Sequence, residues 1–272
     1  MSEKVQILLT NDDGIQSPGL WAAAEALSEL GYVHVVAPRE QSSGLGRSLP
    51  NNSDGKIAPQ ILHVHEKDWT VYAVGGTPAQ AVLHGVLEII GTQPALVVSG
   101  INYGENLGTG VTVSGTVGAA LEAATLGIPA MAVSLQVPSD YYLSYSREID
   151  FSAARYFTQV FGRLMLANHL PPDVDVLKVD IPANATPETP WVITRQSRHR
   201  YYQPVAPLRK NWGDPAPVGY ELDVNPEKQP EDSDIYALLV KQVVSVTPLS
   251  IDLTSRVRPE ELEAVLRRLP DR

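Results

Sequence analysis

Ile7-Leu8-Leu9-Thr10-Asn11-Asp12-Asp13-Gly14 is the stretch around which the rest of the chain is organised. An apolar run leads directly into two adjacent aspartates and a glycine, which is the pattern of a buried strand followed by an acidic turn. The residues after it predict a helix that begins at Pro18 and ends before Gly31. The apolar face of this helix consists of Leu20, Ala23, Ala24, Leu27 and Leu30. A strand, a turn and a helix form the first unit of an α/β domain, and ligands of such domains bind beyond the carboxyl ends of the strands.

Asp12 and Asp13 place two negative charges side by side. Each carboxylate raises the pKa of the other unless a positive charge lies between them. A divalent metal ion would supply that charge. An Asx-type turn, together with the favourable position of acidic residues at a helix N-terminus, explains the same two residues without any ligand. This stretch alone therefore leaves both interpretations open.

The composition limits the class of protein. With 272 residues, of which 43% are hydrophobic, the chain is long enough to bury a complete core. It contains no cysteine, which excludes disulfides, thiolate zinc ligands and cysteine nucleophiles. Its net charge of −10 argues against a surface that binds long nucleic acid. No apolar run approaches the roughly 20 residues of a membrane helix, and no signal-peptide pattern precedes the first strand. We therefore expect a cytoplasmic protein without a membrane or nucleic-acid partner.

Strands and helices alternate as far as Ile181. The predicted strands cover residues 33–38, 61–65, 70–74, 95–100, 130–135 and 174–181, and the predicted helices cover 78–90, 117–126 and 151–167. This alternation predicts an α/β fold with a mostly parallel sheet that is covered by helices on both faces. We place this domain in residues 1–188.

The pattern changes after Pro182. Predicted strands cover residues 191–196, 220–224 and 235–246, and a proline-rich connection lies between the first two. We interpret residues 189–272 as a β-rich extension that packs on the domain or on a second subunit. A short amphipathic helix is predicted over 259–269, and its apolar side chains are expected to face inward. These side chains are Leu262, Val265, Leu266 and Leu269.

Three loops follow the predicted strands that end at Thr10, Pro38 and Gly100, and they should converge at the carboxyl edge of the sheet. They carry oxygen donors, namely Asp12, Asp13, Ser43 and Asn102. Ligation by oxygen alone suits a hard ion such as Mg²⁺ or Mn²⁺ and not zinc.

A second group of residues has the character of a phosphate cradle. Ser114-Gly115-Thr116 places two hydroxyls and free N–H groups at the start of an alanine-rich helix, where anions bind readily. Three glycines of the preceding loop allow the backbone to approach a ligand closely. Ordinary helix capping explains the same segment equally well when it is taken alone. Together with an acidic metal site on a neighbouring loop, it favours phosphate ester chemistry.

Two further groups have a simpler interpretation. His63 and His65 share one face of a predicted strand, and a partly exposed strand face explains them better than a chelate. One basic and aromatic cluster consists of Arg195, Arg198, His199, Arg200, Tyr201 and Tyr202. A solvated edge explains this cluster better than a second phosphate site or a base site.

Taken together, the motifs resemble the SurE family of stationary-phase survival proteins, which are nucleoside-monophosphate phosphatases. The matching segments, in order, are Asn11-Asp12-Asp13-Gly14, Ala37-Pro38 with Gln41-Ser42-Ser43-Gly44, Gly75-Gly76-Thr77-Pro78, Ser99-Gly100-Ile101-Asn102-Tyr103-Gly104-Glu105-Asn106, Ser114-Gly115-Thr116-Val117 and Val244-Ser245-Val246-Thr247-Pro248-Leu249. Each segment is weak evidence alone, whereas the ordered set is highly specific.

The resemblance implies a Rossmann-like three-layer α/β/α domain with a β extension that forms dimers and tetramers. It also implies hydrolysis of nucleoside 5′- and 3′-monophosphates and, in some members, of short polyphosphate. The implied metal ligands are Asp12, Asp13, Ser43 and Asn102. The implied phosphate-binding residues are Asn106, Ser114, Gly115 and Thr116.

We therefore expect a metal-dependent 5′-nucleotidase that holds one Mg²⁺ or Mn²⁺ per subunit and acts as a homodimer or homotetramer. Asp12 and Asp13 are the predicted catalytic residues, with Asp12 accepting a proton from the attacking water. A non-catalytic nucleotide-binding regulator is the alternative. An aspartyl-phosphate phosphatase would need Asp-x-Asp after the first strand, and a zinc deacetylase would need His-Pro-Asp-Asp; the sequence has neither there.

Overall fold

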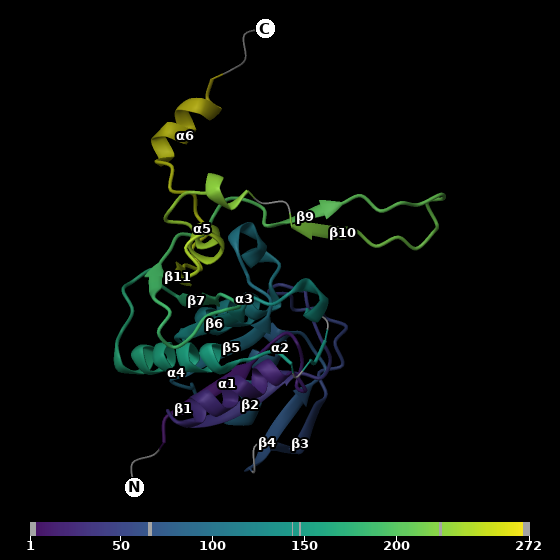
Figure 1. Ribbon diagram of the computed structural model, residues 1–272, viewed down its shortest axis with the longest axis vertical. Helices are drawn as coiled ribbons and strands as arrows, with labels where there is room; N and C mark the ends of the chain where they lie inside the picture. Colours follow the sequence, from purple (N-terminus) through teal and green to yellow (C-terminus); the bar gives the residue numbers. More distant parts are fainter. Residues whose placement is uncertain (1–3, 65–66, 143, 147, 223–224, 269–272) are drawn as a thin grey trace.

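The computed structural model describes residues 4–64, 67–142, 144–146, 148–222 and 225–268. Within these ranges the chain forms a nine-stranded sheet in the order β3-β4-β2-β1-β5-β6-β7-β11-β8, shown in Figure 1. Its strands are β1 (Gln6–Thr10), β2 (Tyr32–Pro38), β3 (Ile57–Val64), β4 (Lys67–Val74), β5 (Leu96–Tyr103), β6 (Ala130–Leu135), β7 (Val176–Ile181), β8 (Trp191–Ile193) and β11 (Val244–Leu249). The strands from β4 to β7 in this order pair in parallel, while β3 and β11 are antiparallel to their inner neighbours.

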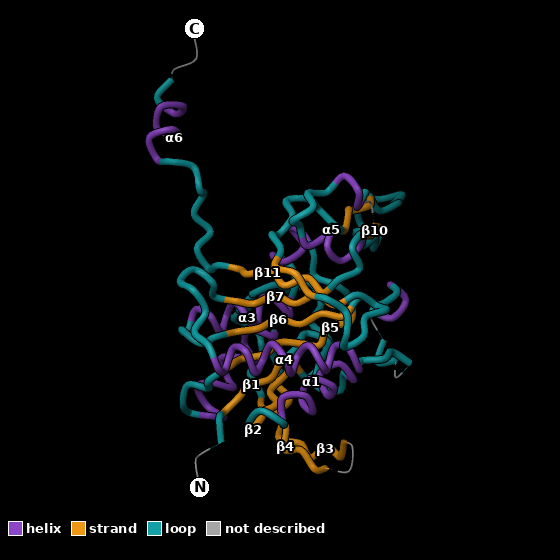
Figure 2. Tube along the Cα trace, turned by 60° about the vertical axis from the view of Figure 1, so that its left-hand side comes forward, coloured by secondary structure: helices purple, strands orange, loops and turns teal. Residues whose placement is uncertain are grey.

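Helices cover both faces of the sheet, as Figure 2 shows. Helices α1 (Pro18–Ser28) and α4 (Ser152–Ala167) pack on the face to which Ile7 and Leu9 point. Helices α2 (Pro78–His84) and α3 (Gly115–Thr125) pack on the face to which Leu8 points. Because side chains alternate along a strand, the continuous apolar run of β1 supplies both cores. The predicted three-layer α/β/α fold with a mostly parallel sheet is confirmed.

The predicted helix starts have identifiable local causes. Thr77 accepts a hydrogen bond from the backbone of Gln80 at 3.2 Å, and the Gln80 side chain accepts one from Thr77 N at 3.1 Å. This capping box, with Pro78 as the first helical residue, starts α2. A π-helical segment, η1 (Gly85–Ile90), continues α2 to the predicted end.

Strand β1 lies where the order of the sheet reverses. It pairs in parallel with β2 on one side and with β5 on the other. The connection through α1 leads to β2, whereas the later strands extend the sheet from β5 in the opposite direction. A crevice forms at such a reversal, at the carboxyl ends of the two central strands. Asp12 and Asp13 follow the end of β1 after one residue, Asn11, and therefore lie at this crevice.

The segment after residue 188 contributes both to the sheet and to projecting elements. Strand β11 pairs with β7, and β8 pairs with β11, so both complete the main sheet. Strands β9 (Tyr202–Val205) and β10 (Gly219–Leu222) form a separate antiparallel pair at the base of an arm that extends away from the body in Figure 1. Helix α5 (Asp234–Leu239) packs on the body, and α6 (Pro259–Leu266) lies away from it. The division into residues 1–188 and 189–272 stays a prediction.

Two expectations for this segment are wrong. Residues 235–246 do not form one strand, because α5 occupies 234–239 and β11 begins at Val244. The Ser233 side chain accepts a hydrogen bond from Tyr236 N at 3.2 Å and caps the helix, a signal that the apolar run obscured. Helix α6 does not turn its apolar side chains inward: Leu262, Val265 and Leu266 are 46%, 61% and 74% exposed.

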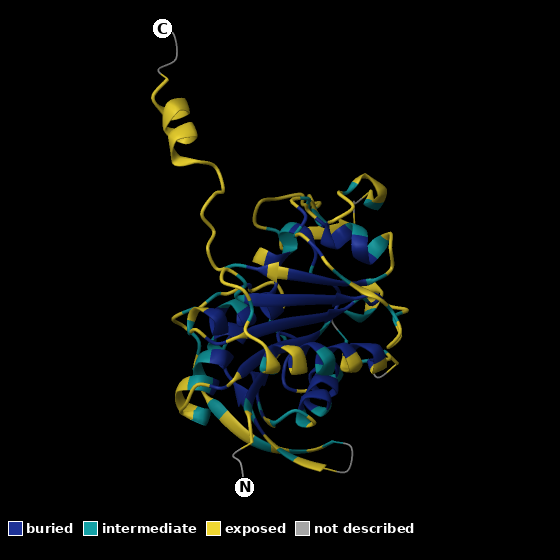
Figure 3. Ribbon diagram, turned by 90° about the vertical axis from the view of Figure 1, so that its left-hand side faces the viewer, coloured by how far each residue is buried: buried dark blue, intermediate teal, exposed yellow. Residues whose placement is uncertain are grey.

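Figure 3 shows the contrast between the buried strands and the exposed α6. The apolar stripe of α6 is therefore a face that its own chain does not cover in the described ranges. Leu269, His65 and Val224, which also belong to the expectations above, lie outside the described residues. None of the helices in these ranges has the length and apolar character needed to cross a bilayer.

Candidate functional site

The loops after β1, β2 and β5 and the start of α3 meet at the crevice beside β1. Ser42 N donates to the carbonyl of Asp12 at 2.7 Å, which joins the first two loops. Tyr103 N donates to Asp13 Oδ2 at 3.2 Å, which joins the first loop to the end of β5. Thr116 Oγ1 donates to Asp12 Oδ1 at 2.5 Å, which joins it to α3. Three of the predicted loops and the predicted cradle thus share one place in the fold.

Asp12 is 4% exposed and lies against the first turn of α3. A Cβ atom at Gly115 would lie 2.7 Å from the Cβ of Asp12 and 2.8 Å from its Oδ2. Only glycine allows the helix start to approach the carboxylate this closely, because any side chain would displace it. The sequence therefore needs glycine at position 115 to bring the N–H groups of α3 to Asp12.

Asp13 is 3% exposed and is held by different groups. Besides Tyr103 N–H, the Gln41 side-chain amide lies 3.4 Å from Asp13 Oδ1. The hydroxyl of Tyr145 donates to the backbone carbonyl of Asp13 at 2.9 Å. The two neighbouring carboxylates therefore point to different walls of the crevice: Asp12 faces α3 and Asp13 faces β5 and the loop after β2.

Burial raises the pKa of both carboxyl groups above the usual value of 3.8. The Thr116 hydroxyl opposes this at Asp12, whereas the negative charge of Asp12 raises the pKa of Asp13 further. Within the described residues, neither carboxylate forms an ion pair with a lysine, arginine or histidine. Two buried, adjacent and uncompensated carboxylates fit a divalent cation, because it would satisfy both charges at once.

Ser43 and Asn102 are the neutral oxygen donors predicted for the same ion. Gln41 Nε2 lies 3.2 Å from Ser43 Oγ as well as near Asp13, so this one amide spans the two residues. Asn102 Nδ2 donates to the carbonyl of Gly104 at 2.6 Å, which leaves Oδ1 as the atom able to bind a cation. No three His, Cys, Asp or Glu residues gather into a metal cluster in the described part of the chain, and the neutral oxygens of Ser43 and Asn102 are the predicted side-chain donors that would join the two carboxylates around a cation.

Of the predicted phosphate residues, Gly115 and Thr116 lie against Asp12, Ser114 precedes them, and Asn106 lies on the loop after β5. Ser114 Oγ accepts a hydrogen bond from Val117 N at 3.1 Å and caps α3. Asn106 Nδ2 donates to Ser134 Oγ at 2.8 Å, and Asn106 N donates to Asp180 Oδ1 at 2.8 Å. The hydroxyl of Ser114 therefore has a capping role, while Asn106 is fixed at both its side chain and its backbone.

The basic and aromatic cluster divides into two halves. Arg195 is exposed and pairs with Asp232 at 3.3 Å. Tyr201, in contrast, is 1% exposed and donates to Glu105 Oε1 at 2.5 Å. Tyr202 OH donates to Tyr142 OH at 3.1 Å. The arginine is part of a solvated edge, as expected, whereas the tyrosines reach inward to the loop that carries Asn106. His63 pairs with Asp68 at 2.9 Å on an exposed strand face.

Sequence reasoning missed several residues of this region. Gln41 and Tyr145 contact Asp13, and the carbonyl of Tyr142 accepts a hydrogen bond from Gln41; only Gln41 stood in a segment with a recognisable pattern. The buried charges Lys178, Asp180 and Asp234 were also missed. The alternation of charged and apolar residues in Lys178-Val179-Asp180, within an otherwise apolar strand, was the signal that could have revealed two of them.

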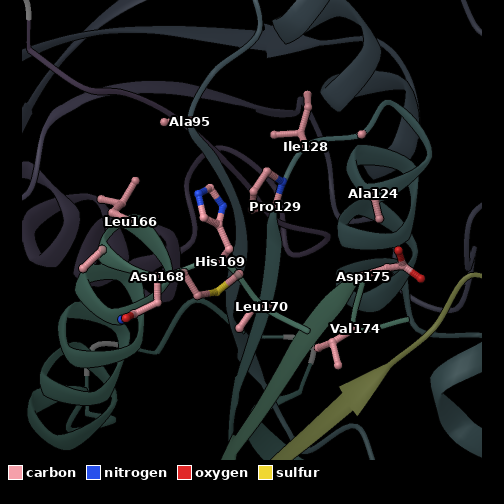
Figure 4. A pocket seen from close by; sticks show the side chains of 13 residues that line it. Ala95, Ala124, Ile128, Pro129, Leu166, Asn168, His169, Leu170, Val174 and Asp175 are labelled. Carbon is pink, nitrogen blue, oxygen red and sulfur yellow. The ribbon is translucent and has the colours of Figure 1, made fainter. Parts of the chain in front are cut away.

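A separate cavity of about 390 Å³ lies at the opposite edge of the sheet and is shown in Figure 4. Ala95, Pro129 and Asp175, which immediately precede β5, β6 and β7, line it, and His169 joins them from the segment after α4. None of the residues that line this cavity is a predicted site residue. The candidate site is therefore the crevice at the carboxyl edge and not this cavity.

Comparison with known proteins identifies the family. The family model described as "Survival protein SurE" matches residues 7–203. The chain belongs to the SurE family. A relative from Thermococcus kodakarensis, named 5′-nucleotidase SurE, is 42% identical over 264 residues, which cover 96% of this chain and 98% of the relative. A relative of the same name from Archaeoglobus fulgidus is 43% identical over 262 residues, which cover 95% of this chain and 96% of the relative.

The fold agrees with a solved SurE structure. The crystal structure of the SurE protein from Aquifex aeolicus matches with a TM-score of 0.76 and 32% sequence identity, over 96% of this chain and 99% of that chain. The resemblance inferred from the ordered motifs is thereby confirmed. The match covers the extension after residue 188 as well as the α/β domain.

Proposed function

We propose that this SurE chain is a metal-dependent phosphomonoesterase that hydrolyses nucleoside 5′-monophosphates to nucleoside and phosphate. The observation that carries the proposal is the pair of buried, uncompensated carboxylates of Asp12 and Asp13 beside the N-terminus of α3. A cation between carboxylates and an anion cradle on the facing wall are the two parts that phosphoryl transfer to water needs. The names of the relatives support the substrate class.

The donor set Asp12, Asp13, Ser43 and Asn102 would hold one Mg²⁺ or Mn²⁺ per subunit. Such an ion, when bound, polarises phosphoryl oxygens and lowers the pKa of water. Asp12 lies beside the start of α3, where the phosphate of the substrate would bind, and we therefore assign to its carboxylate the acceptance of a proton from the attacking water. Gln41 and the backbone of Tyr103 hold Asp13 in place.

The anion cradle binds the phosphate of the substrate. The N–H groups at the start of α3, next to Gly115 and Thr116, carry partial positive charge and point to the crevice. The Ser114 hydroxyl and the Asn106 amide would add further donors to the same phosphate. These groups stabilise the charge that develops on the phosphoryl oxygens in the transition state.

The deciding experiment measures phosphate release from a panel of nucleoside monophosphates. The panel contains 5′- and 3′-esters and short polyphosphate, each assayed with Mg²⁺, Mn²⁺ or a chelator, for the wild type and Asp13→Ala. We expect metal-dependent release from 5′-monophosphates and its loss in the variant. Tight nucleotide binding without release, from folded wild-type protein with Mn²⁺, would instead support a nucleotide-binding regulator.

We further propose that the protein forms a homodimer or homotetramer and acts in the cytoplasm. The arm beyond β9 and β10 exposes large apolar side chains, with Leu208 at 100% and Trp212 at 92% exposed. Helix α6 exposes a further apolar stripe. Scattered exposed apolar residues are normal, but two projecting elements that both carry them favour contacts with other subunits.

A further inference from the structure

Three buried charged side chains, from β7 and α5, form a cluster that contacts the loop carrying Asn106. Lys178 and Asp180 are two residues apart on β7, so their side chains point to the same face of the sheet. Asp234 is the first residue of α5. All three side chains are 0% exposed. The Lys178 ammonium pairs with the Asp180 carboxylate and lies 3.3 Å from Asp234 Oδ2. We refer to these residues as the Lys178 triad.

Both carboxylates of the Lys178 triad also bind the backbone of one short loop. Asp180 Oδ1 accepts a hydrogen bond from Asn106 N at 2.8 Å. Asp234 Oδ2 accepts one from Gly108 N at 3.0 Å. Asp234 Oδ1 accepts another from Ser197 N at 2.9 Å, which fixes the direction of that carboxylate. The triad therefore holds two amides of the same loop, on either side of residue 107.

The energetics of burial argue that stability alone does not explain the Lys178 triad. Removing charges from water is energetically costly, and apolar residues of similar volume often give an equally stable core. Burial lowers the pKa of Lys178, but the two carboxylates outweigh this and raise it, so the ammonium stays charged. An ionised carboxylate accepts a hydrogen bond from N–H about twice as strongly as a neutral acceptor. The benefit of the triad is therefore the firm placement of the loop.

The loop placed in this way carries a predicted phosphate-binding residue. The backbone of Asn106 is held by Asp180, and its side-chain Nδ2 is held by Ser134 on β6 at 2.8 Å. Gly108 fits the same corner tightly, since a Cβ there would lie 2.4 Å from the carbonyl oxygen of His199. Small displacements at Asp180 or Asp234 would therefore move the Asn106 amide relative to Asp12 and the start of α3.

We propose that Lys178, Asp180 and Asp234 are positioning residues for phosphate binding, which act through the backbone of the loop 106–108 and set the place of the Asn106 side chain. The proposal rests on the proposed function, because that function gives Asn106 its role. It assigns the triad no contact with the substrate. It predicts that phosphate affinity and metal affinity respond separately to changes in the triad.

Lys178→Met tests the proposal, because it removes the ammonium but keeps a side chain of similar shape. Asp234→Asn is the milder second variant if Lys178→Met does not fold. The probes are inorganic phosphate, as an inhibitor and as a ligand, and Mn²⁺, titrated directly. We expect phosphate affinity and kcat/KM to fall roughly tenfold or more, as for the loss of a hydrogen bond to a charged group, while Mn²⁺ affinity stays within about twofold of the wild type. Hydrogen exchange at the amides of Asn106 and Gly108 should become faster.

Asp175→Asn is the matched control. Asp175 also accepts a backbone hydrogen bond, from Ile251 N at 2.8 Å, but it precedes β7 and lies at the opposite edge of the sheet. We expect wild-type phosphate and Mn²⁺ affinities in this variant.

Two results would overturn the inference: unchanged phosphate affinity and amide exchange in both triad variants, or equal losses of phosphate and Mn²⁺ affinity, which would indicate a general structural role. Absence of phosphate release from the wild type would instead contradict the proposed function. Phosphate binding and amide exchange would still test the triad in that case.

Discussion

At the scale of single residues, Asp12 and Asp13 are neighbours in sequence with different contacts. Asp12 contacts the Thr116 hydroxyl and the start of α3, whereas Asp13 is bound by Tyr103 N–H and Gln41. Both carboxylates lie at the crevice that follows β1. Their contacts with different walls of the crevice then orient them in different directions. A metal ion between them and a phosphate on the side of α3 would use each carboxylate differently.

Replacing Asp12 by Asn should remove turnover without unfolding the chain. The amide has nearly the shape of the carboxylate, but it cannot accept a proton from water, and it binds a cation more weakly. We expect kcat to fall by about a hundredfold to ten-thousandfold, the usual contribution of a general base. Phosphate release from a nucleoside 5′-monophosphate with saturating Mn²⁺ measures this, and circular dichroism checks the fold. A rate within about threefold of the wild type would contradict the role given to Asp12.

Asp13→Asn should make the metal-free protein more stable at neutral pH. Burial and the charge of Asp12 raise the pKa of Asp13 above 3.8 in the folded state, so the folded chain prefers the protonated carboxyl. The stability that this group contributes is complete below the unfolded pKa and is lost as the pH rises through the folded pKa. Asparagine has no proton to lose there. Denaturant unfolding in the presence of a chelator measures the free energy of unfolding from pH 4 upwards. This free energy should fall less with rising pH in the variant than in the wild type. Equal declines would contradict the assigned cause.

At the scale of elements, the loop that carries Ser43 is held by contacts with α3 and with the turn that precedes it. Gly46 N donates to the carbonyl of Val113 at 2.9 Å, and Arg47 Nε lies 2.6 Å from Glu122 Oε2. Gly118 allows this approach, because a Cβ there would lie 2.4 Å from the carbonyl carbon and oxygen of Gly46. The helix whose first turn we propose as the phosphate site thus also holds the loop of a predicted metal ligand.

Gly118→Ala should therefore disturb metal binding from a distance. The added methyl group must push the loop away from α3, which typically costs about 1–3 kcal/mol of stability. Because Ser43 moves with the loop, we expect Mn²⁺ affinity to fall roughly tenfold, as for other changes that disturb ligand orientation. Isothermal titration with Mn²⁺ measures this.

Gly110→Ala is the control for this substitution, since nothing lies within 4 Å of a Cβ at Gly110. It should retain the wild-type Mn²⁺ affinity. Equal affinities in the two variants would show that the contact between the loop and α3 does not support the site.

The elements that sequence reasoning predicted are those with a long and consistent pattern. The central strands are buried on both faces, so their continuous apolar runs were unambiguous, and the order of strands and helices predicted where the loops would meet. Helix α5 was missed because its six residues give less than two turns of periodicity. The Lys178 triad was missed because its partners Lys178 and Asp234 are 56 positions apart, and no local pattern joins them. The predicted roles of the site residues await the experiments above.

At the scale of the whole molecule, two elements project from the body with apolar side chains in solvent. The arm beyond β9 and β10 carries Leu208 and Trp212, and α6 carries Leu262, Val265 and Leu266. The amphipathic pattern of α6 places Leu262, Val265 and Leu266 on one face, but the prediction that this face is buried is wrong, because all three side chains are exposed. Sequence alone does not distinguish a buried face from an exposed one, because periodicity shows which side chains share a face and not what covers it.

Trp212→Ser should lower the mass of the assembly if the arm contacts another subunit. Large aromatic side chains contribute about 2 kcal/mol or more at the centre of an interface, which is enough to shift a reversible assembly at micromolar concentration. Light scattering after size-exclusion chromatography measures the mass over a range of concentrations.

Leu87→Ser, at a residue that is 66% exposed on η1, is the control and should leave the mass unchanged. A wild-type protein that is itself monomeric would contradict the proposed assembly. A chain that ends after Ser255 lacks α6, and its mass in solution tests the contribution of that helix.

The link between Asp234 and Gly108 also governs the order in which the site is completed during synthesis. These residues are 126 positions apart, so a ribosome that adds about 5–20 residues per second needs about 6–25 s to travel from one to the other. During that interval Asp12 and Asp13 can already form their hydrogen bonds with the loop after β2 and with the end of β5. The backbone N–H of Gly108, in contrast, still lacks its acceptor, the Asp234 carboxylate. The half of the crevice that contains the carboxylates therefore forms first. A nascent chain that stops before α5 carries the acidic pair but lacks the acceptor that holds Gly108 beside the proposed phosphate-binding loop.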